Sequence, residues 1–316
     1  MGNPFPLASR TVPEPDGKRH IRHVIGPDEY HEDVDDSAFT NMMARWNVAR
    51  GLQAIDTLRT RWPEEAVALC EKLALGEDEL ADWRDAAERI VTGLDATTGI
   101  YEQFGGFHQL EPLDLTQYAD RKVPIDVVIG RERTQRSQVV KQADVVALLA
   151  LLPEEFPGAM AEANYRHYEP RTAHGSSLSA GMHAMVAARL GEADMALRFL
   201  HKAAAADLEF DPNSAGGIRI AGLGGVWQAA VLGFAGLDLR GDAISLAPRL
   251  PPQWRRMSFS VRWRGRLVQI RIADGMVRVA VSDGEPVGIR VAGTAYSVQG
   301  NAALDIQCET RAAVLR

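Results

Sequence analysis

The chain has 316 residues, with 35 Lys and Arg against 42 Asp and Glu, so its formal net charge is −7. Hydrophobic residues make up 46% and charged residues 24%, as in a globular protein, which excludes a disordered chain. The negative charge argues against a nucleic-acid partner, because such proteins present a basic face. No apolar run approaches the roughly 18 residues of a membrane span, and Cys70 and Cys308 form no metal-binding motif, so we expect a cytoplasmic protein.

Residues 1–36 are predicted to be irregular, because several prolines interrupt them. From Ser37 the apolar residues follow a helical period, and Asp36 or Ser37 can cap the start of that helix. Its predicted apolar stripe comprises Phe39, Met42, Met43, Trp46, Ala49, Leu52 and Ile55.

Further helices follow, separated by a looped stretch over residues 94–121, and no strand is expected between residues 37 and 238. The predicted helical ranges are 63–75, 77–91, 131–152, 178–190, 192–208 and 222–236. After Arg240 polar and apolar residues alternate, and turns are expected at 264–265, 274–275 and 283–284, the pattern of antiparallel hairpins. We therefore expect an irregular segment (1–36), a helical domain (37–238) and a small β-domain (243–316).

The first candidate site is the sequence HVIGPDEYHEDVDD at 23–36. A Gly26–Pro27 turn would project Asp28 and Glu29, followed by Tyr30 and His31. A carboxyl group beside aromatic rings suits a general acid, because apolar surroundings favour its protonated form. Two alternatives stay open, an acidic helix-capping loop and a divalent-cation site. The oxygen ligands of such a cation site would be Asp28, Glu32, Asp33, Asp35 and Asp36.

The second candidate is the polar run RERTQRSQVVKQAD at 131–144. On a continuous helix, Arg133, Ser137 and Lys141 would share one face and present cations to an anion or a hydroxyl-rich ligand. A solvated polar face is the alternative. Lys141 and Gln142 stand where the run becomes apolar, which favours the binding interpretation.

Two further segments could bind an anion. In TAHGSSLS at 172–179, Ser176 or Ser177 can cap the following helix, or both hydroxyls and the His174 imidazole can form a phosphate pocket at its start. In GGIRIAGLGGVW at 216–227, the glycines indicate close helix packing, and Arg219 is a candidate anion ligand. This second segment does not spell the dinucleotide-binding pattern.

Together these segments resemble the maltose, trehalose and kojibiose phosphorylases of glycoside hydrolase family 65. The matching runs are GPDEYHEDVDDSAFTNMMARWN, IYEQFGGF, GRERTQRSQVVKQADVV, YEPRTAHGSSLSAGMHAMVA and GIRIAGLGGVWQAAVLGF, and LPPQWRRMSFSVRWRGRLVQIRI is similar to the start of the family's β-domain. The resemblance implies a mainly α fold, namely about half of an (α/α)6 barrel followed by a small antiparallel β-sandwich-like domain. The chain would then be the C-terminal portion of the enzyme.

The resemblance also implies a role for individual residues. Glu29 would be the general acid, Lys141 and Gln142 would contact the sugar together with Tyr30 and His31, and Ser176 and Ser177 would hold phosphate with His174 and Arg219 beside them. The sequence departs from the family pattern at two positions. Gly175 stands where relatives often have Asp, and Arg219 stands where many have His.

The implied reaction is inverting phosphorolysis of an α-glucosyl disaccharide of the maltose, trehalose or kojibiose type, which gives β-glucose 1-phosphate and glucose. Phosphate acts as co-substrate, and no cofactor, metal, nucleic acid or membrane is expected. An inverting hydrolase would instead need a second carboxylate as base. The alternatives are such a hydrolase and an inactive fragment that serves as a binding module. A homodimer, or a complementing chain that supplies the other half of the barrel, is an expected partner.

Overall fold

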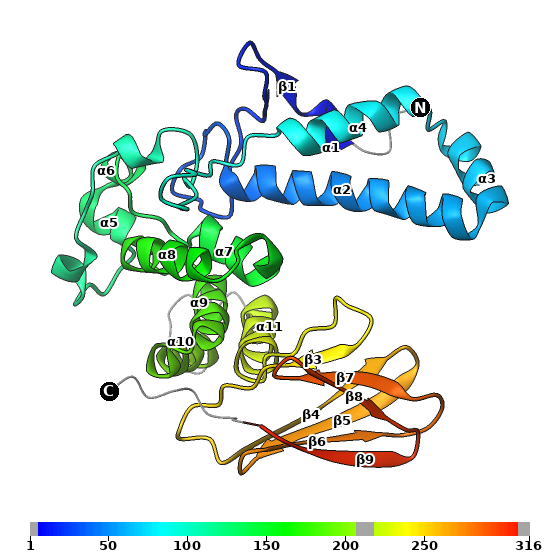
Figure 1. Ribbon diagram of the computed structural model, residues 1–316. Coiled ribbons are helices and arrows are strands. Elements are labelled where there is room, and N and C mark those ends of the chain that lie inside the picture. Colours follow the sequence, from blue (N-terminus) through cyan, green and yellow to red (C-terminus); the bar gives the residue numbers. More distant parts are fainter. Residues whose placement is uncertain (1–5, 207–217, 309–316) are drawn as a thin grey trace. The chain divides into compact units, whose positions relative to one another are not determined.

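The computed structural model describes residues 6–206 and 218–308 (Figure 1). The chain divides into two compact units, Met1–Gly175 and Ser176–Arg316. The domain boundaries expected after residues 36 and 238 stay predictions, and the predicted positions 207–208, 216–217 and 309–316 lie outside the described residues. Within the described part, every helix is too short or too polar to cross a membrane.

The described part of the first unit is helical, apart from the small hairpin β1–β2. Its strands are β1 (Val12–Pro13) and β2 (Arg19–His20). Its α-helices are α1 (Pro6–Ser9), α2 (Ala38–Arg61), α3 (Pro63–Leu73), α4 (Glu77–Arg89), α5 (Ile125–Ile129), α6 (Arg131–Gln135), α7 (Asp144–Leu151) and α8 (Ala159–Tyr168). Short 3-10 turns are η1 (Phe107–Gln109), η2 (Leu115–Tyr118), η3 (Pro153–Glu155) and η4 (Glu169–Arg171).

The predicted helix starts in this unit are confirmed, whereas the predicted apolar stripe of α2 is wrong in part. Ser37 caps α2 by accepting the Thr40 N–H at 3.4 Å, and Pro63 occupies the first turn of α3. The long helix α2 packs along α4 (Figure 1) and presents a face rotated from the predicted one. Ala49 is exposed, while Ala44 and Val48 lie in the core with Leu80 and Trp83 of α4.

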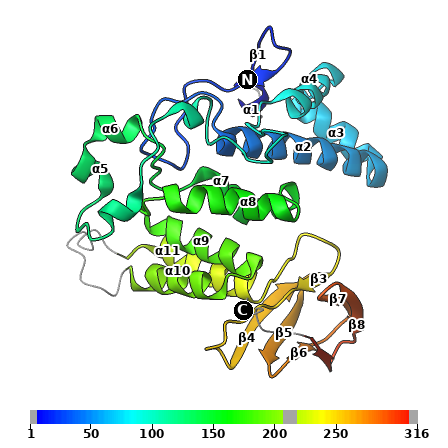
Figure 2. The same cartoon turned by 60° about the vertical axis from the view of Figure 1, so that its left-hand side comes forward.

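The helix predicted over residues 131–152 does not form as one element. It is interrupted between α6 and α7 (Figure 2), and residues 137–141 pair with two other segments instead. The Gln138 N–H donates to Glu111 O at 2.8 Å, and the Val140 N–H donates to Arg171 O at 3.0 Å. These backbone bonds, and the preference of β-branched valines for extended conformation, outweigh the helical period of the sequence. Arg133, Ser137 and Lys141 therefore do not share a helix face.

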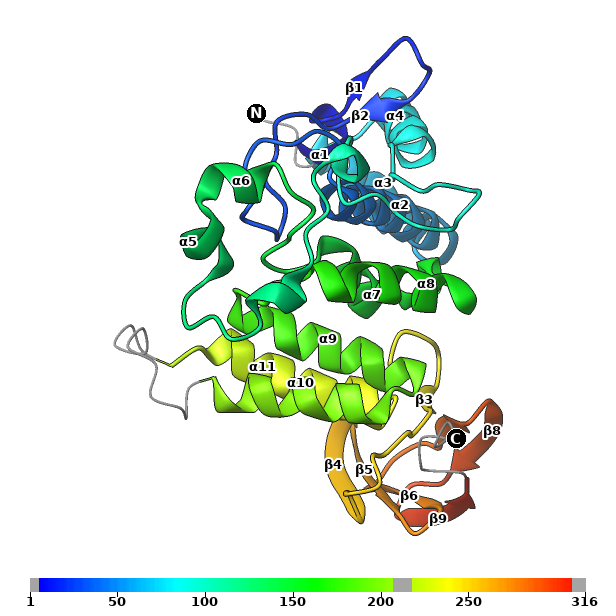
Figure 3. The same cartoon turned by 90° about the vertical axis from the view of Figure 1, so that its left-hand side faces the viewer.

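The described residues at the start of the second unit form three helices and a π-helical turn, and Figure 3 shows α9, α10 and α11 stacked together. The hairpin α9–α10 turns at Gly191, whose φ of 89° suits glycine. The helices α9 and α11 approach closely because Gly181 and Gly225 face each other, and a Cβ on Gly181 would lie 3.1 Å from the Gly225 backbone. The predicted close helix packing is thus observed. The bounds are α9 (Ser177–Leu190), α10 (Ala193–Ala205), α11 (Ile220–Gln228) and η6 (Ala229–Phe234).

The C-terminal strands form two sheets, one with the order β3-β7-β8 and one with the order β4-β5-β6-β9. Two-residue turns at Arg264–Gly265 and Asp274–Gly275 join β4–β5 and β5–β6 as predicted, and both residues of each turn have positive φ. The turn at 283–284 instead leads from one sheet to the other. The pairing of β3 with β7 is parallel and was not expected. The strands are β3 (Ile244–Leu246), β4 (Arg256–Trp263), β5 (Arg266–Ala273), β6 (Met276–Val281), β7 (Val287–Val291), β8 (Thr294–Val298) and β9 (Ala302–Gln307).

Candidate active site

The loop that carries the predicted general acid is closed at its base by backbone pairing. Val24 and Val34 exchange two N–H···O bonds, of 2.9 and 3.0 Å. Beside them, the buried Asp36 carboxylate accepts the Ile21 N–H at 3.2 Å and lies 2.7 Å from the His20 Nδ1. Because Asp36 also adjoins the start of α2, residues 24–34 project from the helix end as one closed loop.

The acidic residues of this loop and of its base are engaged in ion pairs with several different basic side chains. A divalent-cation site would need several of these oxygens to converge on one point, but each carboxylate faces a basic side chain. The pairs are Asp28 with His31, Glu32 with Arg131, Asp33 with His23, Asp35 with Arg22, and Asp36 with both His20 and Arg22.

Asp28 is buried and holds the loop against the extended segment that precedes α7. Its Oδ1 accepts the Lys141 N–H at 2.8 Å and the Tyr30 N–H at 3.2 Å. Its Oδ2 lies 2.6 Å from the His31 Nδ1, and the His31 Nε2 lies 3.0 Å from Ser137 O. His31 is itself buried and packs against Phe104, with ring centroids 4.9 Å apart. Asp28 and His31 thus join two parts of the chain that are more than 100 residues apart.

A second buried carboxyl group, Asp144 at the start of α7, lies under the same loop. Its Oδ1 accepts the Asp28 N–H at 2.7 Å. Its Oδ2 lies only 2.1 Å from the position that a Cβ on Gly26 would occupy. Burial raises the pKa of Asp144 well above its ordinary value, and the nearby Asp28 carboxylate raises this pKa further. The glycine at position 26 is therefore required by this close approach.

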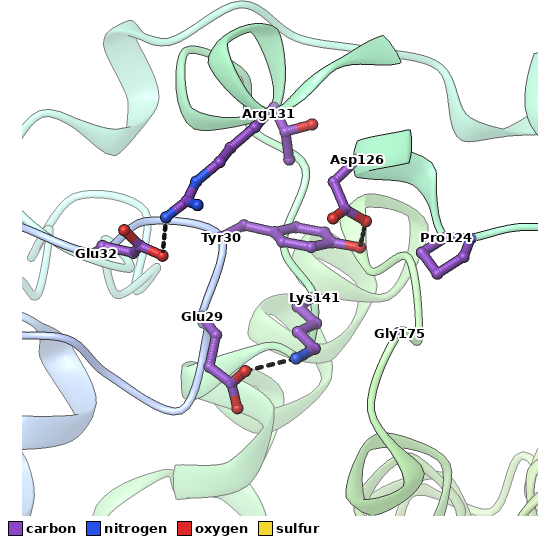
Figure 4. A pocket seen from close by; sticks show the side chains of 9 residues that line it. Glu29, Tyr30, Glu32, Pro124, Asp126, Arg131, Lys141 and Gly175 are labelled. Atoms are coloured by element: carbon purple, nitrogen blue, oxygen red, sulfur yellow. Dashed lines mark hydrogen bonds and ion pairs between the residues drawn. The ribbon is translucent and has the colours of Figure 1, made fainter. Parts of the chain in front are cut away.

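These contacts place Glu29 at the edge of a pocket of about 310 Å³, a volume at the lower end of the range for small-molecule sites (Figure 4). The Glu29 Oε2 lies 2.5 Å from the Lys141 Nζ. The Glu29 side chain is 58% exposed and that of Lys141 is 25% exposed, so both can meet a ligand. The lining residues are Glu29, Tyr30, Glu32, Pro124, Asp126, Arg131, Thr134, Lys141 and Gly175.

The opposite wall of the pocket is formed by residues around α5 and α6 (Figure 4). The Tyr30 hydroxyl donates to the Asp126 Oδ1 at 3.0 Å. Burial and the Asp126 carboxylate raise the pKa of Tyr30, so its hydroxyl stays protonated at neutral pH. Arg131 pairs with Glu32 at the rim. Gly175 completes the wall, and a Cβ there would lie 3.1 Å from both the Lys141 Cγ and the Tyr30 hydroxyl.

The structure brings the predicted residues Glu29, Tyr30 and Lys141 together in this pocket. The other two sugar-binding candidates point elsewhere: the Gln142 amide donates to Pro27 O at 2.6 Å, and both ring nitrogens of His31 face protein oxygens. Asp126 is a pocket residue that the sequence analysis missed, because no motif surrounds it.

The predicted phosphate ligands are divided between the two units. In the first unit, His174 has a φ of 53°, and the Gly175 N–H that follows it donates to Lys141 O at 3.0 Å. In the second, Ser176 caps α9 by accepting the Leu178 N–H at 3.3 Å, and a hydroxyl that accepts this bond can still donate its own hydrogen.

Ser177 and Arg219 belong to neighbouring helices of the second unit. A Cβ on Gly222 of α11 would lie 3.5 Å from the carbonyl oxygen of Ser177, so the starts of α9 and α11 are close. Arg219 directly precedes α11, and its guanidinium donates to Ala206 O at 2.8 Å. The starts of α9 and α11 therefore lie close together, and the free N–H groups of helix starts suit an anion.

Comparison with known proteins places the chain in a family of carbohydrate-active enzymes. Residues 7–228 match the glycosyl hydrolase family 65 central catalytic domain, and residues 237–298 match the C-terminal domain of that family. The chain belongs to glycosyl hydrolase family 65.

Several curated relatives are phosphorylases of glucosides. The chain is 35% identical over 261 residues to a kojibiose phosphorylase of Halothermothrix orenii, and these residues are 82% of this chain and 34% of that protein. It is 36% identical over 301 residues to a 1,2-alpha-glucosylglycerol phosphorylase of Bacillus selenitireducens (91% and 39%). It is 32% identical over 292 residues to an alpha,alpha-trehalose phosphorylase of Geobacillus stearothermophilus (92% and 38%). The chain thus spans little more than a third of the length of these relatives.

A solved structure of a human-microbiome protein, named as a kojibiose phosphorylase, superposes with a TM-score of 0.84 at 28% sequence identity. The match covers 95% of this chain and 44% of that chain. This likeness confirms the predicted fold class, a partial helical barrel followed by a β-domain.

Proposed function

We propose that this chain carries the general acid and the phosphate ligands of an inverting phosphorylase that cleaves an α-glucosyl disaccharide to β-glucose 1-phosphate and glucose. The observation that carries the proposal is the contact of 2.5 Å between Glu29 and Lys141 at the edge of the pocket, in a chain whose curated relatives are phosphorylases. No cofactor takes part, and inorganic phosphate is the co-substrate.

In the proposed reaction, the Glu29 carboxylic acid protonates the glycosidic oxygen as its bond to C1 breaks. An oxygen of hydrogen phosphate forms the new bond to C1 from the opposite face, which inverts that carbon. The proton that hydrogen phosphate releases on becoming a monoester dianion replaces the one that Glu29 gave. Phosphate is already a nucleophile, so this reaction needs no second carboxylate as base, whereas inverting hydrolysis does.

Lys141 has two roles in this proposal. In the free protein its ammonium contacts the Glu29 carboxylate, whereas proton donation requires that this carboxyl group face the glycosidic oxygen. We expect sugar hydroxyls to replace Glu29 as the partner of Lys141 when the substrate binds, so that the Glu29 carboxyl group is free to face the glycosidic oxygen. Tyr30 would contact the same sugar. His174, Ser176, Ser177 and Arg219 are assigned to phosphate by the resemblance and by their positions at helix starts.

The test is phosphate-dependent release of glucose 1-phosphate by the purified chain from kojibiose, trehalose, maltose or nigerose. Glu29→Gln should lower kcat by about 10²–10⁴-fold, the usual contribution of a general acid, and leave the fold intact. Glu32→Gln, on the same loop, is the matched control and should keep most of the activity. Activity retained by Glu29→Gln would remove this residue from its role. Glucose release without phosphate would identify a hydrolase, and no turnover by the folded chain would favour the binding module.

A further inference from the structure

Asp28 binds the backbone beside both residues on which the proposed reaction depends, Glu29 and Lys141. Glu29 follows Asp28 in the chain, and the residue after it, Tyr30, donates its N–H to the Asp28 Oδ1. The same oxygen accepts the Lys141 N–H at 2.8 Å. The Asp28 Oδ1 therefore accepts hydrogen bonds from two backbone N–H groups, that of Tyr30 next to Glu29 and that of Lys141 itself.

The hydrogen bonds of His31 define how many protons the Asp28–His31 pair holds. The Nε2 faces a backbone carbonyl, Ser137 O, and therefore carries a hydrogen. The 2.6 Å contact between Nδ1 and the Asp28 Oδ2 requires one further proton between the two atoms, whichever of them holds it. The pair is thus neutral overall. This suits the burial of both side chains, because an unpaired buried charge is strongly destabilising.

We infer that Asp28 and His31 are positioning residues, which hold Glu29 and Lys141 in contact at the edge of the pocket by hydrogen bonds to one buried carboxylate. Neither residue touches the sugar. His31 extends the link from Asp28 to Ser137 O, and the segment 137–141 is held on its other side by backbone bonds of 2.8–3.0 Å to Arg171, Ala173 and Gly175. The catalytic consequence of this inference rests on the proposed function, whereas the contact itself can be tested without activity.

Substitutions of Asp28 separate hydrogen bonding from charge. In Asp28→Asn, the amide oxygen can still accept from Tyr30 and Lys141, and the amide nitrogen can donate to a neutral His31 that keeps its hydrogen on Nε2. Every hydrogen bond of the wild type is then preserved. In Asp28→Ala, the three hydrogen bonds of the side chain, to Tyr30, Lys141 and His31, are lost. Asp33→Ala is the matched control, because Asp33 pairs with His23 on the same loop at 3.0 Å and both side chains are exposed.

The structural readout is a zero-length cross-link. A carbodiimide joins a carboxylate to an ammonium only where the two groups are in contact, so it should couple Glu29 to Lys141 in the full chain. We expect Asp28→Asn and Asp33→Ala to give the wild-type yield of the Glu29–Lys141 peptide by mass spectrometry, and Asp28→Ala to lower it severalfold. Hydrogen exchange at the Lys141 amide should rise in Asp28→Ala only.

The kinetic readout is the pair kcat and KM for phosphorolysis. A displacement of about 1 Å in a catalytic group costs roughly 10²-fold in rate, so Asp28→Ala should lower kcat by about that factor with a smaller change in KM, and Asp28→Asn should restore most of it.

Wild-type cross-linking in Asp28→Ala would overturn the inference, as would loss of the cross-link in both Asp28 variants. If Asp28→Ala does not fold, His31→Gln, which keeps a donor for Ser137 O, should lower the yield, and an unchanged yield would be equally decisive. Normal cross-linking without glucose 1-phosphate would reject the proposed function and leave the positioning role intact.

Discussion

Replacing Gly26 by Ala tests whether the close approach of the loop to α7 is as tight as the structure indicates. The new Cβ would lie 2.1 Å from the Asp144 Oδ2, 3.1 Å from the Asp144 Cγ and 3.2 Å from the Ser37 Oγ. Asp144 is 2% exposed, so it has no open space into which to move. The carboxyl group would be pushed away from the Asp28 N–H that it accepts at 2.7 Å.

The magnitude follows from three contributions. Overpacking of a buried site costs about 1–3 kcal/mol. Leaving the buried N–H of Asp28 unpaired costs about 1–3 kcal/mol more. Alanine restricts the unfolded chain, which offsets about 0.4–1 kcal/mol. We therefore expect Gly26→Ala to lower the free energy of unfolding of the first unit by between about 1 and about 6 kcal/mol.

The assay is urea unfolding, with hydrogen exchange of residues 24–34 as the local measurement. Gly51→Ala is the matched control, because Gly51 lies within α2 and its Cβ would meet the Trp83 ring at an ordinary 3.5 Å. That substitution should stabilise by about 0.5–1 kcal/mol, the opposite sign. In an Asp144→Ala background the cost of Gly26→Ala should shrink, with a coupling energy of about 0.5–3 kcal/mol. A cost below about 0.5 kcal/mol, or strict additivity, would refute the reasoning.

Two further predictions concern single groups. The pKa of Asp144 is raised in the folded state, whereas the pKa of an Asp in the unfolded chain is about 3.9. Between these two pKa values the folded chain keeps a proton that the unfolded chain has lost. The contribution of Asp144 to the free energy of unfolding therefore declines as the pH rises from about 3.9 towards the folded pKa. Asp144→Asn should remove that decline, and urea midpoints at about pH 5 and about pH 8 measure it; an unchanged slope would contradict the assignment. Ser176→Ala should cost about 0.5–2 kcal/mol through loss of the α9 cap, and should raise the KM for phosphate more than the KM for the sugar. Ser176→Asn should restore the stability but not the phosphate affinity, and recovery of both would reduce Ser176 to a cap.

The sequence by itself determined most of the helices, the two hairpin turns and the residues of the loop at 23–36. These features depend on local physics: apolar residues repeat with the helical period, Ser37 and Ser176 can cap only a helix that starts after them, and a turn with two positive φ angles favours glycine at its second position. The match of several short segments in the correct order then carried the family resemblance.

Only the tertiary structure decided how the site is built. The run at 131–144 has a helical period, but backbone bonds to Glu111 and Arg171 hold its centre extended and direct Lys141 towards Glu29. The family resemblance makes His31 a candidate sugar ligand, but in the structure His31 is buried against Asp28. Asp126 enters the pocket through its contact with a tyrosine 96 residues earlier in the chain. The physical reason is the same in each case: these side chains are placed by partners distant in sequence, and a local pattern contains no information about such partners.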